Sequence, residues 1–194
     1  IRGLEAYLRP RQYGDEFGAR VYKISRDSQG TRLTWMKVTG GSLKVKQVLE
    51  GSWINSEGQQ EIWKEKADQI RIYSGAGYEL AQEAPAGTVC AVTGLEKTCS
   101  GQGLGAEESG ALPLLEPVLT YRIILPPECD VHVMYKKLGQ LEEEIPELHL
   151  VWSEASQEIH VQVMGEVQME ILQSMILERF GTKVSFDSGS IVYK

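Results

Sequence analysis

The feature that most constrains this chain is a change of hydrophobic period between residues 158 and 181. "EIHVQV" alternates polar and apolar side chains, as a half-buried β-strand does. The next stretch, "MGEVQMEILQSMILERFG", places apolar residues three and four positions apart until Gly181. The sequence therefore predicts a strand, a turn at Gly165 and Glu166, and then a helix. The expected apolar stripe of this helix contains Val167, Ile171, Leu172, Met175, Ile176 and Phe180.

The neighbouring elements extend this pattern into a complete α+β domain. "EPVLTYRIIL", "LHLVW" and "TKVSFDS" have the composition of strands. "PPECDVHVMYKKLGQLEEEIP" predicts a helix that starts at Pro126 and Pro127 and ends before Pro146. The resulting order β-α-β-β-α-β predicts a ferredoxin-like domain over residues 115–194.

The first half has a different pattern, with short strands separated by glycine-containing turns from Phe17 onward. "FGARVYKISRD" and "TRLTWMKVTG", for example, are separated by the turn signal "DSQG". This pattern predicts an all-β antiparallel barrel over residues 13–105. We expect residues 1–12 to be the helix end and linker of a preceding domain, and the glycine-rich residues 106–114 to link the two domains.

The charge distribution also separates the two halves. The net charge is −7; residues 1–114 hold 14 Lys and Arg against 14 Asp and Glu, whereas residues 115–194 hold 6 against 13. Such a step indicates two units with different surfaces. The three cysteines form no C-x-x-C pair, which favours a reducing compartment over a disulfide framework or zinc site. The sequence contains neither a long apolar run nor a signal-peptide pattern.

A basic run in the predicted barrel is the main candidate binding site. Residues 17–49 contain seven basic residues and one acidic residue, Asp27, with Phe17, Tyr22 and Trp35 interleaved. Such a face suits an RNA backbone, but the outward side of a solvated sheet is also often basic. The candidate residues are Arg20, Lys23, Arg26, Arg32, Lys37, Lys44 and Lys46.

The other polar motifs favour structure over catalysis. Glu166 would place a negative charge at the positive end of a helix dipole, so we interpret Gly165 and Glu166 as a structural helix start. "GQGLGA" resembles a dinucleotide-binding turn, but no helix is predicted after it. The sequence lacks both a G-x-x-x-x-G-K-[ST] loop and a G-x-S-x-G motif. We therefore expect no catalytic residue and no cofactor in this chain.

Two further groups of side chains are weaker candidates for sites. His149 and His160 are expected to face each other across paired strands, but two histidines without a carboxylate or thiol make a poor metal site. We therefore expect no metal. The acidic run "LEEEIPEL" is interpreted as a solvated helix end, with attraction of a basic partner as the alternative.

Three segments resemble the elongation factor G family. "FGARVYKISRDSQGTRLTWMKVTGGSLKVKQVL" and "APAGTVCAVTGLEKTCSGQGLG" are similar to its second domain, and "MGEVQMEIL" to a helix start in its third. "GEVQMEIL", "LLEPVLTYRIILP" and "QLEEEIPELHLVW" resemble the branch of ribosomal-protection tetracycline-resistance proteins. The sequence departs from the family pattern at Gln47 and Gln102, where the family has aspartate.

The resemblance implies a function for a longer parent protein. That parent would be a ribosome-dependent, cytoplasmic GTPase whose separate G domain holds GTP and magnesium, so this chain itself would not be an enzyme. The implied partners are the ribosome with its small-subunit rRNA, the parent's own G domain and its C-terminal domains, without DNA or a membrane. The expected role is release of tetracycline from the ribosome. The alternatives are an elongation factor G paralogue acting in translocation, or a stand-alone RNA or protein interaction module.

Overall fold

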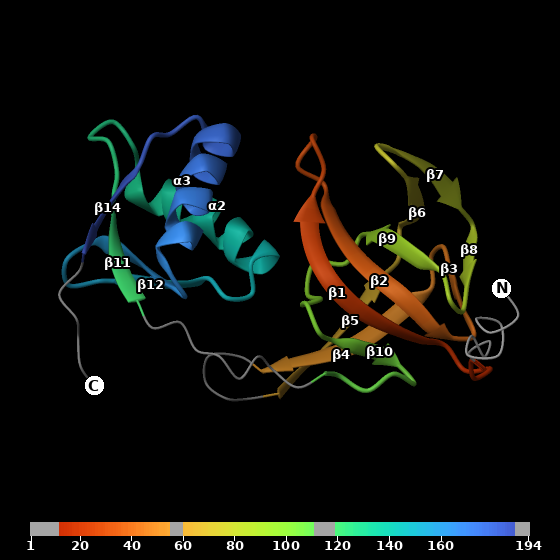
Figure 1. The fold of residues 1–194 in the computed structure, drawn as a ribbon. Coiled ribbons are helices and arrows are strands. Elements are labelled where there is room, and N and C mark those ends of the chain that lie inside the picture. Colours follow the sequence, from red (N-terminus) through yellow and green to blue (C-terminus); the bar gives the residue numbers. More distant parts are fainter. Residues whose placement is uncertain (1–11, 55–59, 111–118, 189–194) are drawn as a thin grey trace, which may run out of the picture. The chain divides into compact units, whose positions relative to one another are not determined.

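The computed structural model describes residues 12–54, 60–110 and 119–188. The chain divides into two compact units, Ile1–Leu112 and Pro113–Lys194 (Figure 1). The described residues are mostly β-structure, with two helices, both in the second unit. The helix end expected within residues 1–12 lies almost wholly outside the described residues. Of the expected linker, residues 106–110 are described, and they belong to the first unit, within which Glu107 bonds to Arg20 and Gly110 to Gly101.

The first unit is built on a six-stranded antiparallel sheet and two smaller pairs of strands. The order in the large sheet is β10-β1-β2-β9-β6-β7. Its strands are β1 (Gly18–Arg26), β2 (Arg32–Gly40), β6 (Gln69–Ser74), β7 (Gly77–Ala81), β9 (Val89–Thr93) and β10 (Gly103–Gly105). The smaller pairs are β3 (Ser42–Lys44) with β8 (Glu83–Pro85), and β4 (Val48–Ile54) with β5 (Gln60–Lys66).

The turn between β1 and β2 is closed as the sequence predicts. The Asp27 carboxylate accepts hydrogen bonds from the backbone N–H groups of Gln29, at 3.0 Å, and Thr31, at 2.9 Å. Gly30 has a φ of 81°, a conformation that glycine adopts without steric cost. Such local bonding fixes the register of the hairpin, in which Lys23 lies opposite Trp35.

Two segments of the first unit each contribute to two strands. "GSLKVKQVLEG" forms β3 and β4, separated at Lys46, whose φ is 66°. "EKADQIRIYSG" forms the end of β5 and the whole of β6, with Ala67 and Asp68 between them. The Lys46 N–H donates to Ala67 O at 2.7 Å, so the two breaks are bonded to each other. This backbone pairing is non-local and leaves no periodic signal in the sequence.

The second unit has the predicted order of elements. They are β11 (Leu119–Ile124), α2 (Val131–Glu144), β12 (His149–Ser153), β13 (Glu158–Val163), α3 (Glu166–Phe180) and β14 (Ser185–Ser188). The sheet is antiparallel in the order β12-β13-β11-β14. Both helices share one core with the sheet, in which Leu138 and Leu172 meet Val161.

The start of α2 differs from the prediction. Pro126 and Pro127 lie in a preceding turn, where Cys129 N donates to Pro126 O at 3.0 Å. The N-cap is Asp130, whose carboxylate accepts from the Val133 N–H at 2.9 Å. An Asp at this position satisfies one of the unpaired N–H groups of the first helical turn, which proline cannot do.

The apolar stripe of α3 was only partly predicted. Leu172 and Ile176 are buried, but Val167 is 71% exposed and Ile171 is 52% exposed. Successive helical residues are rotated by about 100°, so Ile171 faces away when Leu172 faces the sheet. The predicted end is observed, since Gly181 caps the helix with a φ of 65° and donates to Leu177 O at 2.9 Å.

Adjacent residues of α3 provide a direct test of this packing. We expect Leu172→Ala to lower the free energy of unfolding by about 2 to 5 kcal/mol, because it leaves a cavity in the core. The control is Ile171→Ala at the exposed neighbouring position, which should change the free energy of unfolding by no more than about 0.5 kcal/mol. Urea unfolding followed by circular dichroism at the helix band checks both variants. Equal losses for the two would contradict the observed orientation of α3.

Candidate nucleic-acid interface

The seven basic residues of the predicted interface do not form one surface. Lys23, Lys44 and Lys46 are exposed, and Arg20, Arg26 and Lys37 are half-buried. Arg32 is only 6% exposed. The residues also lie on different sheets, because Lys44 belongs to the β3–β8 pair whereas Lys23 and Lys37 belong to the large sheet.

Arg32 is a structural residue, and its assignment to an RNA-binding face was wrong. Its guanidinium donates to Leu95 O at 2.5 Å, to Thr98 O at 2.6 Å and to Thr98 Oγ1 at 2.9 Å. These bonds join the start of β2 to the loop that follows β9. A buried guanidinium with such partners cannot extend to a phosphate without leaving the carbonyl groups unpaired.

Two more of the predicted cations have acidic partners within the unit. Arg20 Nη2 lies 2.5 Å from Glu107 Oε1, and the other oxygen of Glu107 accepts from Thr39 Oγ1 at 2.7 Å. Lys46 Nζ lies 2.7 Å from Asp68 Oδ1, although both side chains are more than half exposed. Exposed pairs of this kind contribute little stability, but they reduce the positive charge offered to a ligand.

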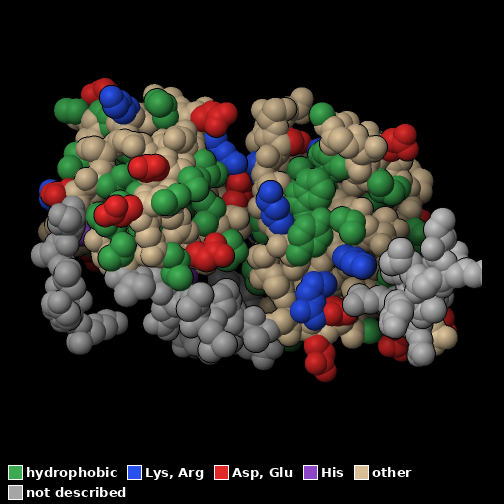
Figure 2. All heavy atoms as spheres, in the orientation of Figure 1, with side chains coloured by type: hydrophobic (Ala, Val, Ile, Leu, Met, Phe, Trp, Pro, Cys, Tyr) green, Lys and Arg blue, Asp and Glu red, His purple; other side chains and the backbone are tan. Residues whose placement is uncertain are grey.

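The side chains of Lys23, Lys37 and Lys44 make no hydrogen bond or ion pair within the described part of the chain. Lys23 lies opposite Trp35 in the β1–β2 register, and Lys37 follows two residues after Trp35 on the same face of β2. We refer to Lys23 and Lys37 as the lysine pair. Figure 2 shows hydrophobic side chains in the region of β1 and β2 with separate basic side chains beside them.

A row of aromatic side chains extends from the lysine pair across the sheet. The ring centroids of Trp35 and Tyr73 are 4.8 Å apart, and those of Tyr73 and Tyr78 are 5.2 Å apart. Trp35 Nε1 donates to Ser25 Oγ at 2.8 Å, which fixes the indole on the outer side of β2. We call Trp35, Tyr73 and Tyr78 the aromatic row.

Sequence reasoning did not identify Tyr73 and Tyr78 as parts of this site. They lie on β6 and β7, far from Trp35 in the chain, and no strand was predicted at β7. The "RIYSGAGYEL" segment did contain a signal, a Ser-Gly-Ala-Gly turn between two Tyr-containing runs. Their proximity to Trp35 required the β2-β9-β6-β7 strand order.

Arg71 and Asp27 hold the outer end of the aromatic row. Arg71 Nη1 lies 2.9 Å from Asp27 Oδ2, and its guanidinium carbon lies 4.5 Å from the ring centroid of Tyr78. Burial by itself would raise the pKa of Asp27, but hydrogen bonds from Arg71, Thr31 and Gln29 hold that pKa below its usual range. The carboxylate is therefore charged at neutral pH and fully engaged with groups of its own unit.

The predicted helix-start turn lies at the N-terminus of α3. Gly165 is its N-cap and Glu166 is an exposed residue of the first turn. The φ of Gly165 is −176°, extended backbone that any residue adopts, so this backbone conformation does not require glycine. No side chain caps this helix start; Gln168 Oε1 instead accepts from the N–H of Met164, the residue before the N-cap, at 2.8 Å.

The acidic run at the end of α2 is not a solvated face, contrary to our interpretation. Glu144 accepts two hydrogen bonds from Arg179, at 2.6 and 2.7 Å, and its side chain is 6% exposed. Glu142 Oε1 accepts from the Leu150 N–H at 3.0 Å. These contacts join the end of α2 to α3 and β12. The basic partner of the run is therefore within the unit.

The two strand histidines are not directly opposite each other. His149 pairs with Gln162, and His160 pairs with Val151, so the two lie diagonally on one face. His160 Nε2 is 3.4 Å from Glu158 Oε2. Within the described ranges, no group of three His, Cys, Asp or Glu side chains is placed to hold a metal ion.

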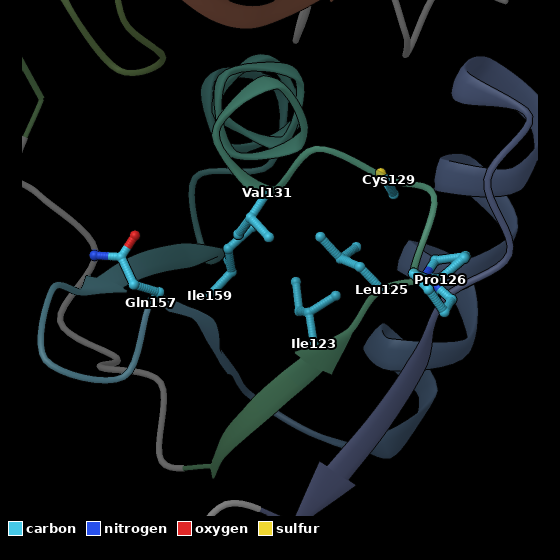
Figure 3. A pocket seen from close by; sticks show the side chains of 8 residues that line it. Ile123, Leu125, Pro126, Cys129, Val131, Gln157 and Ile159 are labelled. Atoms are coloured by element: carbon cyan, nitrogen blue, oxygen red, sulfur yellow. The ribbon is translucent and has the colours of Figure 1, made fainter.

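The second unit contains a small cavity of about 260 Å³ below the start of α2. Figure 3 shows apolar side chains from β11, β13 and α2 that point into it. They include Ile123, Leu125, Val131 and Ile159. Cys129 and Gln157 also line the cavity. Neither described helix is long and apolar enough to cross a membrane.

The contrasting burial of Arg32 and Lys44 can be tested through stability. We expect Arg32→Met to lower the free energy of unfolding of the first unit by about 1 to 3 kcal/mol, because buried carbonyl groups lose their donor. Lys44→Met should change it by no more than about 0.5 kcal/mol. Tryptophan fluorescence in urea reports mainly this unit, since three of the four tryptophans lie in it. An unchanged free energy of unfolding in Arg32→Met would refute the structural role of Arg32.

Comparison with known proteins identifies relatives over nearly the whole chain. No family model matches it. It is 29% identical to the tetracycline resistance protein TetP of Clostridium perfringens, over 90% of this chain and 26% of that protein. It is 26% identical to elongation factor G of Pseudothermotoga lettingae, over 99% of this chain and 27% of the relative. For elongation factor G 2 of Syntrophus aciditrophicus the identity is 24%, over 100% of this chain and 29% of the relative.

A solved structure has the same fold. The chain matches a crystal structure of a Thermus thermophilus protein with a TM-score of 0.69 and 22% identity, over 91% of this chain and 26% of that one. The chain thus spans between a quarter and a third of the length of these proteins. The resemblance inferred from the sequence is confirmed, since the chain is similar over nearly its whole length to a tetracycline resistance protein and to elongation factors G.

Proposed function

We propose that this chain is the ribosome-docking part of a translational GTPase that protects the ribosome from tetracycline. The observation that carries the proposal is the match to a tetracycline resistance protein over 90% of the chain. In this proposal the GTP and magnesium belong to a separate G domain of the parent. The two units supply contacts to the ribosome and to the parent's own G and C-terminal domains, in the cytoplasm.

The same proposal assigns a fold type to each of the two units. The first unit would be a translation-factor barrel, formed by the six-stranded sheet and its two added pairs. The second would be ferredoxin-like, which its β-α-β-β-α-β order and its strand order β12-β13-β11-β14 support. The chemistry is assigned in this proposal to the parent's G domain.

The contact with the ribosome is assigned to the first unit. Its lysine pair has no acidic partner among the described residues, whereas the second unit carries the whole excess of negative charge. Lysines without internal partners can replace the counterions of phosphate groups. The proposed partner of this face is small-subunit rRNA. Beside the lysine pair, Lys44 is the other candidate without an acidic partner among the described residues, whereas Arg26 has an interaction of its own.

A second function has specific support. Elongation factors G match the chain at 24 to 26% identity over nearly its whole length. A paralogue that acts in translocation is therefore the competing proposal. A G-x-x-x-x-G-K-[ST] motif upstream in the gene is required by both, and its absence would favour a stand-alone interaction module.

A translation assay separates the two GTPase functions. We expect the full-length protein with GTP to restore peptide synthesis in a cell-free reaction stalled by tetracycline. The control is the same reaction with a non-hydrolysable GTP analogue, which should not sustain repeated rescue. Ribosome-stimulated GTP hydrolysis without rescue would contradict protection and support the translocation paralogue.

The lysine pair is tested by salt dependence. In the full-length protein, Lys23→Gln with Lys37→Gln should weaken binding to small ribosomal subunits. The slope of log affinity against log salt should fall by about 1.4 to 1.8, since each lost phosphate contact removes about 0.7 to 0.9. Lys97→Gln is the matched control, because Lys97 is exposed in the same unit but lies in the loop after β9. An unchanged slope in the double variant would refute this contact.

A further inference from the structure

We propose that the aromatic row is a stacking platform for an unpaired base of RNA. This inference rests on the proposed function, in which the lysine pair meets rRNA phosphates, and it names the part of the RNA that this face receives. The ligand would be a single-stranded or bulged segment rather than a continuous duplex.

The sheet is constructed so that rings from separate strands meet on its outer side. Trp35 on β2 and Arg71 on β6 both lie opposite Ala91 on the intervening strand β9. Ala91 is fully buried although its neighbours Cys90 and Val92 point into the core. A methyl group at this position leaves room for Trp35 and Tyr73 to meet above β9, where a larger side chain would separate them.

The outer end of the row is exposed and held in position. Tyr78 is 46% exposed. Arg71 lies over its ring, and Arg71 is itself fixed by Asp27, as described above. The tilts between successive rings are 41° and 44°, so the row presents ring edges and faces rather than one closed stack. A ring with restricted motion loses little entropy when a base stacks on it.

The charges beside the row favour RNA over an apolar protein partner. The lysine pair lies at the Trp35 end, and the carboxylate at the outer end, that of Asp27, is neutralised by Arg71. Glu79 pairs with Ile72 and alternates to the other side of β7. Aromatic rings next to cations that have no partner among the described residues are the combination that binds bases and phosphates together.

The expected RNA is single-stranded because bases in a duplex are stacked on one another. A-form helices present phosphates and 2′-hydroxyl groups, and their base faces are inaccessible. Lysines alone would bind duplex and single-stranded RNA through phosphate charge. The aromatic row therefore adds a preference for single-stranded over duplex RNA, which the lysine pair cannot supply.

The test compares three fluorescein-labelled RNAs on the 194-residue chain by anisotropy at one salt concentration. They are a single-stranded oligonucleotide of mixed sequence, a hairpin duplex of equal charge and an abasic sugar-phosphate oligomer. We expect Tyr78→Leu to weaken binding of the single strand about tenfold, within the range measured for loss of one base stack. Binding of the duplex and of the abasic oligomer should not change.

Tyr78→Phe is the matched control, because it keeps the ring and removes only the hydroxyl group; it should bind the single strand as the wild type does. The comparison of normal and abasic oligomers on the wild-type protein needs no variant, so it remains decisive if Tyr78→Leu folds poorly. Equal affinity of the wild type for those two oligomers would overturn the stacking inference.

The same assay distinguishes failure of the inference from failure of the proposed function. If Lys23→Gln with Lys37→Gln weakens all three RNAs and Tyr78→Leu weakens none, stacking is refuted and the phosphate contact stands. If the wild type binds none of the RNAs at low salt, both are overturned, and the row would be assigned to a protein partner instead.

Discussion

The Asp27–Arg71 ion pair is the interaction on which the candidate site depends. Asp27 closes the β1–β2 turn through the backbone of Gln29 and Thr31, and its second oxygen receives Arg71 from β6. One carboxylate thus joins the hairpin that carries Trp35 to the strand next to Tyr78. Removing one partner of such a largely buried pair leaves the other charge without compensation, so the turn, the sheet and the aromatic row are coupled through this contact.

The internal pairing of charges determines which cations are available to a ligand. Arg32 is used by backbone carbonyl groups, Arg20 by Glu107, and Lys46 by Asp68. The same happens in the second unit, where Arg122 lies between Glu158 and Asp187. A count of charges along the sequence overstates the basic face, because it includes side chains that the fold has already neutralised.

Features that depend on local chemistry could be predicted from the sequence, whereas those that depend on distant contacts could not. Asp27 and Gly30 predicted the hairpin turn, and Gly181 the end of α3, because the bonds that form them join residues a few positions apart. By contrast, the sequence of a β-strand does not show whether a basic residue is buried or exposed. Arg32 is buried because backbone carbonyl groups of the loop after β9 accept its hydrogen bonds, and this loop is distant in the sequence. Glu144 likewise looked solvated because its basic partner lies on the other helix.

The division of charge between the units gives the proposed function a physical basis. Phosphate attraction acts over about 8 to 10 Å at physiological salt, so a surface is selected by its own uncompensated charges rather than by those of the whole chain. The second unit holds the excess of acidic residues, and its arginines are largely paired with them. In the proposed function, RNA contact is therefore assigned to the first unit despite the negative charge of the chain. Within that unit we assign it to the aromatic row flanked by the lysine pair, for which the described residues supply no partner.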